Sequence, residues 1–100
     1  MSAGILQTLN TLVSVEEIHR NFPKLPTPKH VSVSEIKDSV GEDAYEVVLV
    51  YPDSVKEKDL DWEKLHSVVD WIRNQIFENR TSDRWPYFRL GRESDFKQVA

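Results

Sequence analysis

The longest regular pattern of apolar positions lies between Asp59 and Arg80. Apolar side chains recur there at steps of three and four residues, which places them on one side of an α-helix whose other side is polar. We therefore predict that residues 59–80 form the main helix, beginning near Asp59 to Asp61, where carboxylates favour the positive end of the helix dipole. The apolar side of this helix consists of Trp62, Leu65, Val69, Ile72 and Ile76.

The N-terminal part of the chain predicts a helical segment followed by a stiff connector. In residues 1–21, apolar side chains recur with helical spacing. Ser14 and Glu17 match a capping box, so we expect the helix to bend or restart near Ser14. Residues 22–29 contain three prolines, each of which disfavours helix at its own position and at the one before it. They should therefore form a connector without helix.

Residues 30–51 predict a β-hairpin. Val31 and Val33 alternate with serines, as in a half-buried strand, and Ile36 departs from this alternation, which indicates a bulge or the end of the strand. A turn containing Gly41 follows. The next strand is apolar on both faces over its second half, which is typical of a central strand. One of its faces carries Tyr45, Val47, Leu49 and Tyr51.

Residues 85–92 predict a last strand, and residues 93–100 a frayed tail in which Phe96 could dock. Pro86 has no N–H to donate, which indicates an edge strand or the start of a strand. Alternation along this strand directs Phe88 and Leu90 inward and Tyr87 and Arg89 outward.

Together these elements predict one α+β domain spanning residues 1–100. We expect a small antiparallel sheet of about three strands, in the chain order α-β-β-α-β. The long helix should pack on one face of this sheet, with the N-terminal helix beside it. The pattern does not show whether the last strand pairs with the first or the second strand.

Composition narrows the class of protein. One hundred residues, 39% of them hydrophobic, suit a single domain with one core. The absence of cysteine excludes disulfides, thiolate metal sites and cysteine nucleophiles. No signal-peptide pattern and no run of about 18 apolar residues occurs, so we expect a cytoplasmic protein without a membrane span. The net charge of −4 opposes a general attraction to nucleic acid or to anionic membranes.

No motif indicates catalysis, a cofactor or a metal. His19, His30 and His66 lack the spacing of a local chelate, and the acids of residues 38–43 lack the alternation of a calcium loop. Three glycines form no phosphate-binding loop. Ser67 follows His66, but adjacent residues of a helix point about 100° apart, so the two cannot form a catalytic dyad. We therefore expect a non-catalytic protein with no metal or cofactor. An enzyme or small-ligand binder, with a site between the sheet and the N-terminal helix, is a further alternative.

Trp71 is the most informative candidate for partner binding. It lies on the polar side of the predicted main helix, near Lys64, Gln75 and Glu78. A large aromatic side chain on a polar helix face can anchor a protein partner, because it buries much area at a small cost in side-chain entropy. The alternative is that the N-terminal helix or the tail covers Trp71 within the same chain.

The last strand provides a second candidate surface. Aromatic side chains that stack on bases, interleaved with arginines that contact phosphates, are typical of single-stranded nucleic-acid binding. The alternative is that Trp85 and Phe88 lie in the core and the arginines pair with acids such as those of the hairpin turn. The residues concerned are Arg84, Trp85, Tyr87, Arg89 and Arg92.

Our leading hypothesis is a small cytoplasmic protein-interaction or accessory domain. Its partner would be another protein or a second copy of the same chain, because the edges of a three-stranded sheet invite pairing across a two-fold axis. Nucleic-acid binding through the last strand is the alternative. The sequence does not specify the partner, the pathway or the oligomeric state.

Overall fold

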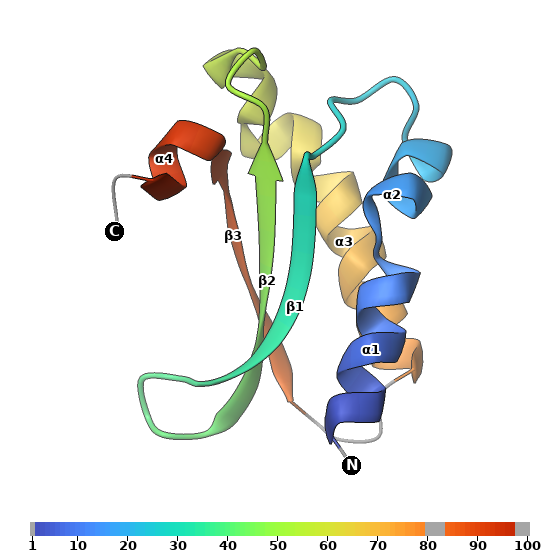
Figure 1. Cartoon of the computed structure of the whole chain (residues 1–100), viewed down its shortest axis with the longest axis vertical. Helices are drawn as coiled ribbons and strands as arrows, with labels where there is room; N and C mark the ends of the chain where they lie inside the picture. The colour runs from blue at the N-terminus through green and yellow to red at the C-terminus, as the bar shows by residue number, and fades with distance from the viewer. Residues whose placement is uncertain (1, 80–83, 98–100) are drawn as a thin grey trace.

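A three-stranded sheet with helices along one face forms the fold (Figure 1). The computed structural model describes residues 2–79 and 84–97. In chain order the elements are α1 (Ser2–Leu12), α2 (Val15–Asn21), β1 (His30–Lys37), β2 (Asp43–Tyr51), the 3₁₀ helix η1 (Glu57–Leu60), α3 (Trp62–Asn79), β3 (Trp85–Arg92) and α4 (Glu93–Lys97). The α+β class and the order of the main elements predicted from the sequence are confirmed.

The sheet has the order β1-β2-β3, so β2 is central, as its apolar pattern predicted, and β1 and β3 are the two edges. The β1–β2 pair is antiparallel, and the β2–β3 pair is parallel. The sheet is therefore mixed rather than antiparallel throughout. The connection from β2 to β3 contains all of α3, which provides the length that a parallel crossover needs, whereas a hairpin turn joins only antiparallel strands.

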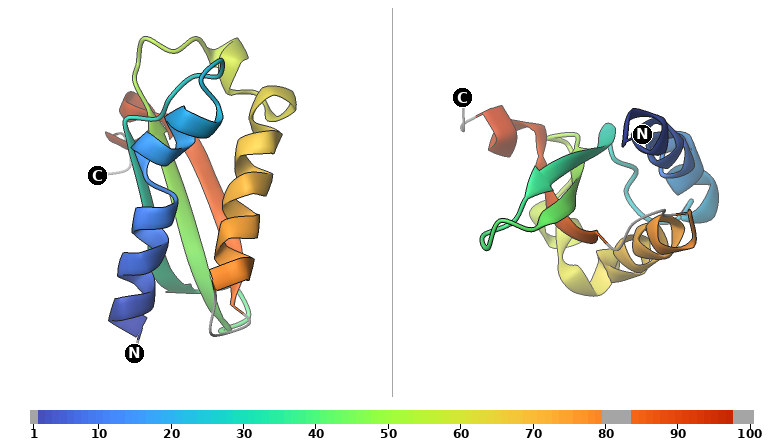
Figure 2. Two further views of the ribbon diagram at one scale, coloured as in Figure 1. Left: turned by 90° about the vertical axis from the view of Figure 1, so that its right-hand side faces the viewer. Right: turned by 90° about the horizontal axis from the view of Figure 1, so that it is seen from below.

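The core lies between the sheet and helices α1, α2 and α3, which cover the same face (Figure 2). Alternate residues of β2 point into it, because successive side chains of a strand face opposite sides. On the strand side the fully or nearly fully buried residues are Val33, Tyr45, Val47, Leu49 and Tyr51. The helices contribute Leu9, Val13, Ile18, Leu65, Val68, Val69, Ile72 and Ile76.

The opposite side of the sheet, here called the open face, is not covered by α1, α2 or α3 (Figure 2). The pairing register aligns its residues across the three strands. They are His30, Ser32, Ser34 and Ile36 on β1, Ala44, Glu46, Val48 and Val50 on β2, and Tyr87, Arg89 and Gly91 on β3. Trp85 lies opposite Ala44 at the start of β3, but its ring lies beside Phe77 and Arg73 of α3.

The expected restart of the N-terminal helix is confirmed. The helix α1 ends at Leu12, and Ser14 caps α2, since its side chain accepts a hydrogen bond from the Glu17 N–H at 3.4 Å. Such a cap satisfies one of the amides that a helix start leaves without an intrahelical partner. The break lets both short helices bury apolar residues on one core.

Two details of the main helix differ from the prediction. The helix α3 begins at Trp62, after η1, and Asp61 caps it by accepting from the Lys64 N–H at 2.9 Å. Trp62, expected on the buried side, is 59% exposed, whereas Val68 is buried. The reason is position: helical side chains lean toward the N-terminus, so the first side chain of α3 extends past the start of the helix. The predicted end at Arg80 and the turn at 81–83 lie outside the described residues.

Ile36 does not mark a bulge. Pairing between β1 and β2 continues without interruption from His30 opposite Val50 to Lys37 opposite Asp43. Ile36 thus takes its regular place on the open face, opposite Ala44.

Residues 93–97 form the short helix α4 rather than a frayed tail. The Ser94 N–H donates to Asp53 Oδ1 at 2.9 Å, and Lys29 pairs with Glu93 at 2.6 Å. A Cβ atom at Gly91 would lie 3.1 Å from the Phe96 ring, so the missing side chain at Gly91 lets α4 pack closely on β3. Residues 98–100 lie outside the described part of the chain.

The outer edge of β1 is closed by a side chain of α1. Asn10 Nδ2 donates to the Val33 carbonyl at 3.0 Å, and the Val33 N–H donates to Asn10 Oδ1 at 2.9 Å. The amide group of Asn10 therefore replaces a neighbouring strand at the middle of this edge.

We expect Asn10→Ala to lower the free energy of unfolding by about 1 to 3 kcal/mol, because both backbone groups of Val33 lose a partner that also keeps α1 in place. Urea denaturation followed by circular dichroism measures this loss. Asn21→Ala is the matched control: it removes one exposed helix-end hydrogen bond to the Glu17 carbonyl and should cost less than about 0.5 kcal/mol. Equal losses for the two variants would contradict the role assigned to Asn10.

Candidate functional site

Trp71 lies half-buried where α3 meets the end of α2. Its ring meets Phe22 edge to face, with centroids 5.9 Å apart and an interplanar angle of 80°. Trp71 thus packs against Phe22 and the core within its own chain. A shallow cavity of about 380 Å³ lies beside it. Thr11, Leu12, Glu17, Asn21, Trp71 and Gln75 line this cavity.

The predicted partner-binding residues are only partly brought together. Trp71 and Gln75 share the cavity, whereas Lys64 lies a further two turns toward the start of α3 and pairs with Asp59 at 2.9 Å. Glu78 is exposed on α3. At Trp71 the structure therefore has a shallow cavity with both polar and apolar walls, and the tryptophan ring packs on Phe22.

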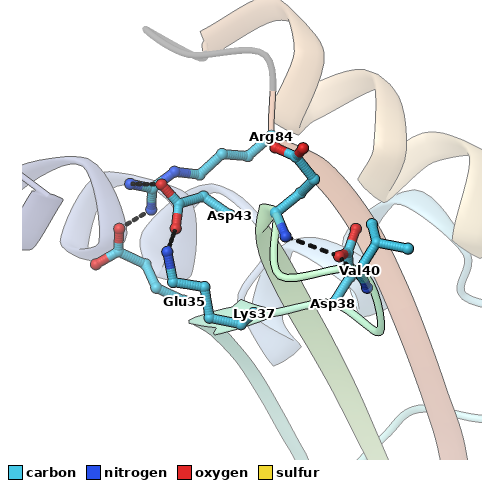
Figure 3. Close-up of polar contacts among 7 residues, drawn as sticks. Glu35, Lys37, Asp38, Val40, Asp43 and Arg84 are labelled. Atoms are coloured by element: carbon cyan, nitrogen blue, oxygen red, sulfur yellow. Dashed lines mark hydrogen bonds and ion pairs between the residues drawn. The ribbon is translucent and has the colours of Figure 1, made fainter.

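The arginines of the last strand lie beside carboxylates of their own chain. Arg84 pairs with Glu35 and lies 3.8 Å from Asp43, which also pairs with Lys37 (Figure 3). These four side chains come from β1, β2 and the residue preceding β3, and they border a cavity of about 300 Å³. Figure 3 also shows Asp38 at the hairpin turn, where Oδ1 accepts from the Val40 N–H at 3.0 Å.

Arg89 and Arg92 also lie near carboxylates of their own chain. Arg89 lies 3.9 Å from Glu46 and over the ring of Phe96, and Arg92 lies 3.9 Å from Asp95. All three arginines therefore have intramolecular partners, which a phosphate would have to displace.

The two aromatic residues of the predicted nucleic-acid surface point to different neighbours. Trp85 is 52% exposed, but its ring lies 5.8 Å from Phe77 and 6.0 Å from Arg73 on α3. Tyr87 is on the open face, where its hydroxyl donates to Asp38 Oδ2 at 3.3 Å. Partial burial and the Asp38 carboxylate raise the pKa of Tyr87 above its usual value. The two rings do not form one continuous stacking surface.

The feature that sequence reasoning missed is the hydrogen-bonding state of the β3 edge. Backbone groups of alternate residues in a strand point to the same side. The Arg92 N–H donates to Asp95 Oδ2 at 2.9 Å and not to β2. Pro86, three positions of the same alternation before Arg92, has no N–H at all. Phe88 and Leu90 lie between them in this alternation, so their N–H and C=O groups point away from β2.

The β3 edge is defined here by the outward backbone groups of Pro86, Phe88, Leu90 and Arg92. Within residues 2–79 and 84–97, Phe88 and Leu90 have no hydrogen-bond partner on this outward side. The two sheet edges therefore differ: Asn10 occupies the middle of the β1 edge, and the middle of the β3 edge is unoccupied. The position of Pro86 in the same alternation as Phe88 and Leu90 was the available sequence signal.

Three further features of the described residues concern metal ions, membranes and cavities. They contain no group of three or more histidine, aspartate or glutamate side chains placed to hold a metal ion. Among them, no helix has the length and apolar character needed to cross a membrane. A further open cavity of about 260 Å³ is lined by Ile36, Asp38, Ser39 and Tyr87.

Comparison with protein-family models, with curated proteins and with solved structures finds no match to this chain. Its function must therefore be inferred from its own residues.

The half-buried position of Trp71 leads to a stability prediction. We expect Trp71→Ala to lower the free energy of unfolding by about 2 kcal/mol, roughly half the cost for a fully buried tryptophan, because the contact with Phe22 is lost. Trp62→Ala, on the same helix but 59% exposed, should change it by less than about 0.5 kcal/mol. Urea denaturation of both variants measures the two changes. An unchanged denaturation midpoint for Trp71→Ala would mean that Trp71 does not stabilise the fold and would again favour it as an anchor for a partner.

Tyr51 carries a buried hydroxyl without a hydrogen-bond partner among the described residues. Burial raises the pKa of Tyr51 to about 12. We expect Tyr51→Phe to leave the free energy of unfolding unchanged or to raise it by up to about 1 kcal/mol, because the desolvated hydroxyl is removed. A clear loss of stability in this variant would reveal a partner for the hydroxyl.

The same residue predicts a pH dependence. Between about pH 10 and 12 an unfolded tyrosine loses its proton while folded Tyr51 keeps it, so rising pH favours the unfolded chain. Over this window the wild type should lose up to about 3 kcal/mol more than Tyr51→Phe. Denaturant titrations of both proteins at intervals from pH 9 to about 12.5 measure this difference.

Proposed function

We propose that the protein is a small, non-catalytic interaction domain of the cytoplasm that binds an extended protein segment along the β3 edge. The supporting observation is the outward backbone groups of Phe88 and Leu90, which lack a partner within the described residues. Addition of a strand satisfies such groups and provides affinity, while the alternating side chains provide selectivity. At this edge the bound segment would lie next to Tyr87 and Arg89 on the open face.

The arrangement of charges favours a protein partner over nucleic acid. Arg84, Arg89 and Arg92 each lie near a carboxylate of the same chain, and the chain as a whole carries a net charge of −4. A backbone-directed partner does not require these arginines to leave their partners, whereas a phosphate backbone does. The absence of cysteine agrees with a reducing cytoplasm.

A proline variant tests this function. Leu90→Pro removes one outward N–H and places a ring in the path of an added strand, but leaves the inward bonds to β2, just as Pro86 does in the native edge. We expect it to lose more than about tenfold in affinity for extended peptides selected against the wild type from a displayed library of random sequences. Affinities are measured by fluorescence anisotropy with the selected peptides.

Val31→Pro is the matched control, because Val31 is a partly buried aliphatic residue in the same alternation as Val33 on the other sheet edge. It should leave peptide affinity unchanged. Equal affinities of the wild type and Leu90→Pro for every selected peptide would refute the proposed function.

Amide hydrogen exchange gives a readout that does not depend on a folded variant. In the free wild type the Phe88 and Leu90 amides should exchange fast, and those of Tyr87 and Arg89, which bond to β2, slowly. Binding of a selected peptide should slow exchange at Phe88 and Leu90 selectively. If the bound protein shows no added protection at these two amides, the peptide does not bind along β3.

A further inference from the structure

We infer that the segment that binds the β3 edge is β3 of a second copy of this chain, paired antiparallel about a two-fold axis at Phe88. This inference rests on the proposed function and names the partner. The result would be a continuous six-stranded sheet in which β3 of each copy is no longer an edge. The same patch serves both copies, as an isologous interface requires.

The alternation of backbone groups restricts the possible registers. Outward groups of one strand must oppose outward groups of the other, so the axis passes through a residue and not between two residues. An axis at Tyr87 would leave only residues 85–89 within both strands, and an axis at Gly91 only residues 90–92, so the central candidates are Phe88, Arg89 and Leu90. An axis at Phe88 lets residues 85–91 of both copies oppose each other, whereas an axis at Leu90 leaves only residues 88–92 within both strands. The first of these two therefore pairs the longer stretch.

Side chains decide between the axes at Phe88 and at Arg89. An axis at Arg89 would place two arginines directly opposite each other on the open face, which is repulsive. An axis at Phe88 instead places Tyr87 opposite Arg89 of the second copy, and the reverse pair forms by symmetry. Directly opposed residues of such a pair lie about 4.5 Å apart between Cα atoms, and a guanidinium beside a tyrosine ring is attractive.

The helix-side neighbours in this register are also compatible. Phe88 meets Phe88 of the second copy at the axis, and Pro86 lies opposite Leu90 of the second copy. Pro86 has no N–H, but its carbonyl can accept a hydrogen bond from the Leu90 N–H of the second copy. Each such pair therefore lacks only the one hydrogen bond that Pro86 cannot donate. Phe88 and Leu90 are partly buried residues at the border of the core, so their exposed surface would be covered further.

The α4 helices do not occupy the centre of this interface. The helix α4 lies at the far end of β3 and on the open face, where Phe96 packs against Gly91 and Arg89 (Figure 1). In the register centred on Phe88, residues 92–97 of each copy lie beyond or at the end of the paired stretch. The two copies of α4 therefore stay apart at opposite ends of the interface.

The affinity should be low, because a paired strand of seven residues per copy is a small interface and association carries a large entropic cost. We expect a monomer–dimer equilibrium in sedimentation analysis that becomes visible as the concentration rises to about 1 mM. Leu90→Pro should abolish this equilibrium, and Val31→Pro should retain it.

Disulfide trapping tests the register, because the protein has no cysteine of its own. Tyr87→Cys and Arg89→Cys chains are mixed in a glutathione redox buffer, and the products are separated by intact mass. We expect the mixed Tyr87→Cys/Arg89→Cys disulfide to dominate, because about 4.5 Å between Cα atoms lies within the range that a disulfide spans. This mixed dimer also retains one tyrosine–arginine pair, which neither homodimer does.

Two outcomes overturn the inference. A dominant Arg89→Cys homodimer would place the axis at Arg89 instead of Phe88. A wild-type protein that stays monomeric at about 1 mM, with no mixed disulfide, would exclude the second copy as the partner.

The second outcome is distinguishable from failure of the proposed function. A monomer that still binds selected peptides in a Leu90→Pro-sensitive manner keeps the β3 edge as a binding site and assigns it to another protein. A monomer that binds no peptide along β3 removes both proposals.

Discussion

The need of buried and edge backbone groups for hydrogen-bond partners organises this structure. The backbone groups of β2 find partners on both sides, because β2 pairs with β1 in the antiparallel direction and with β3 in the parallel direction. The strand β1 meets this need on its outer side through the amide of Asn10, which bonds both backbone groups of Val33. On the outer side of β3 the backbone groups of Phe88 and Leu90 have no partner within the described residues, whereas Val33 at the middle of β1 has one, and this difference is the basis of the proposed function.

Local periodicity predicted the elements because each one buries a single face. Because the buried side chains of α3 lie on one side of a helix, they recur at steps of three and four residues, and the buried side chains of β2 recur at every second residue. The parallel direction of β3 is not encoded in this way, because strand pairing depends on the crossover path and not on the pattern within the strand. The exposure of Trp62 was missed for a related reason: periodicity assigns a side but does not show how far the sheet extends beneath a helix.

The candidate site was harder to predict than the fold, since it depends on residues far apart in the chain. Asn10 and Val33 are separated by 23 positions, and Tyr87 and Asp38 by 49. The charge pattern did contain a signal: acids are concentrated around the hairpin and bases in the last strand. Arg84 with Glu35 joins these two regions, so the uneven charge is largely used within the chain (Figure 3).

An unpaired edge strand normally risks uncontrolled association, and β3 limits this risk at both ends. Pro86 removes a donor near its start, and Asp95 occupies the Arg92 N–H near its end. Between them only Phe88 and Leu90 offer complete pairs of backbone groups. A window this short cannot template an extended stack of strands, but it suffices for one specific partner whose register is set by the neighbouring Tyr87 and Arg89. The same residues that protect the edge therefore also select what can bind there.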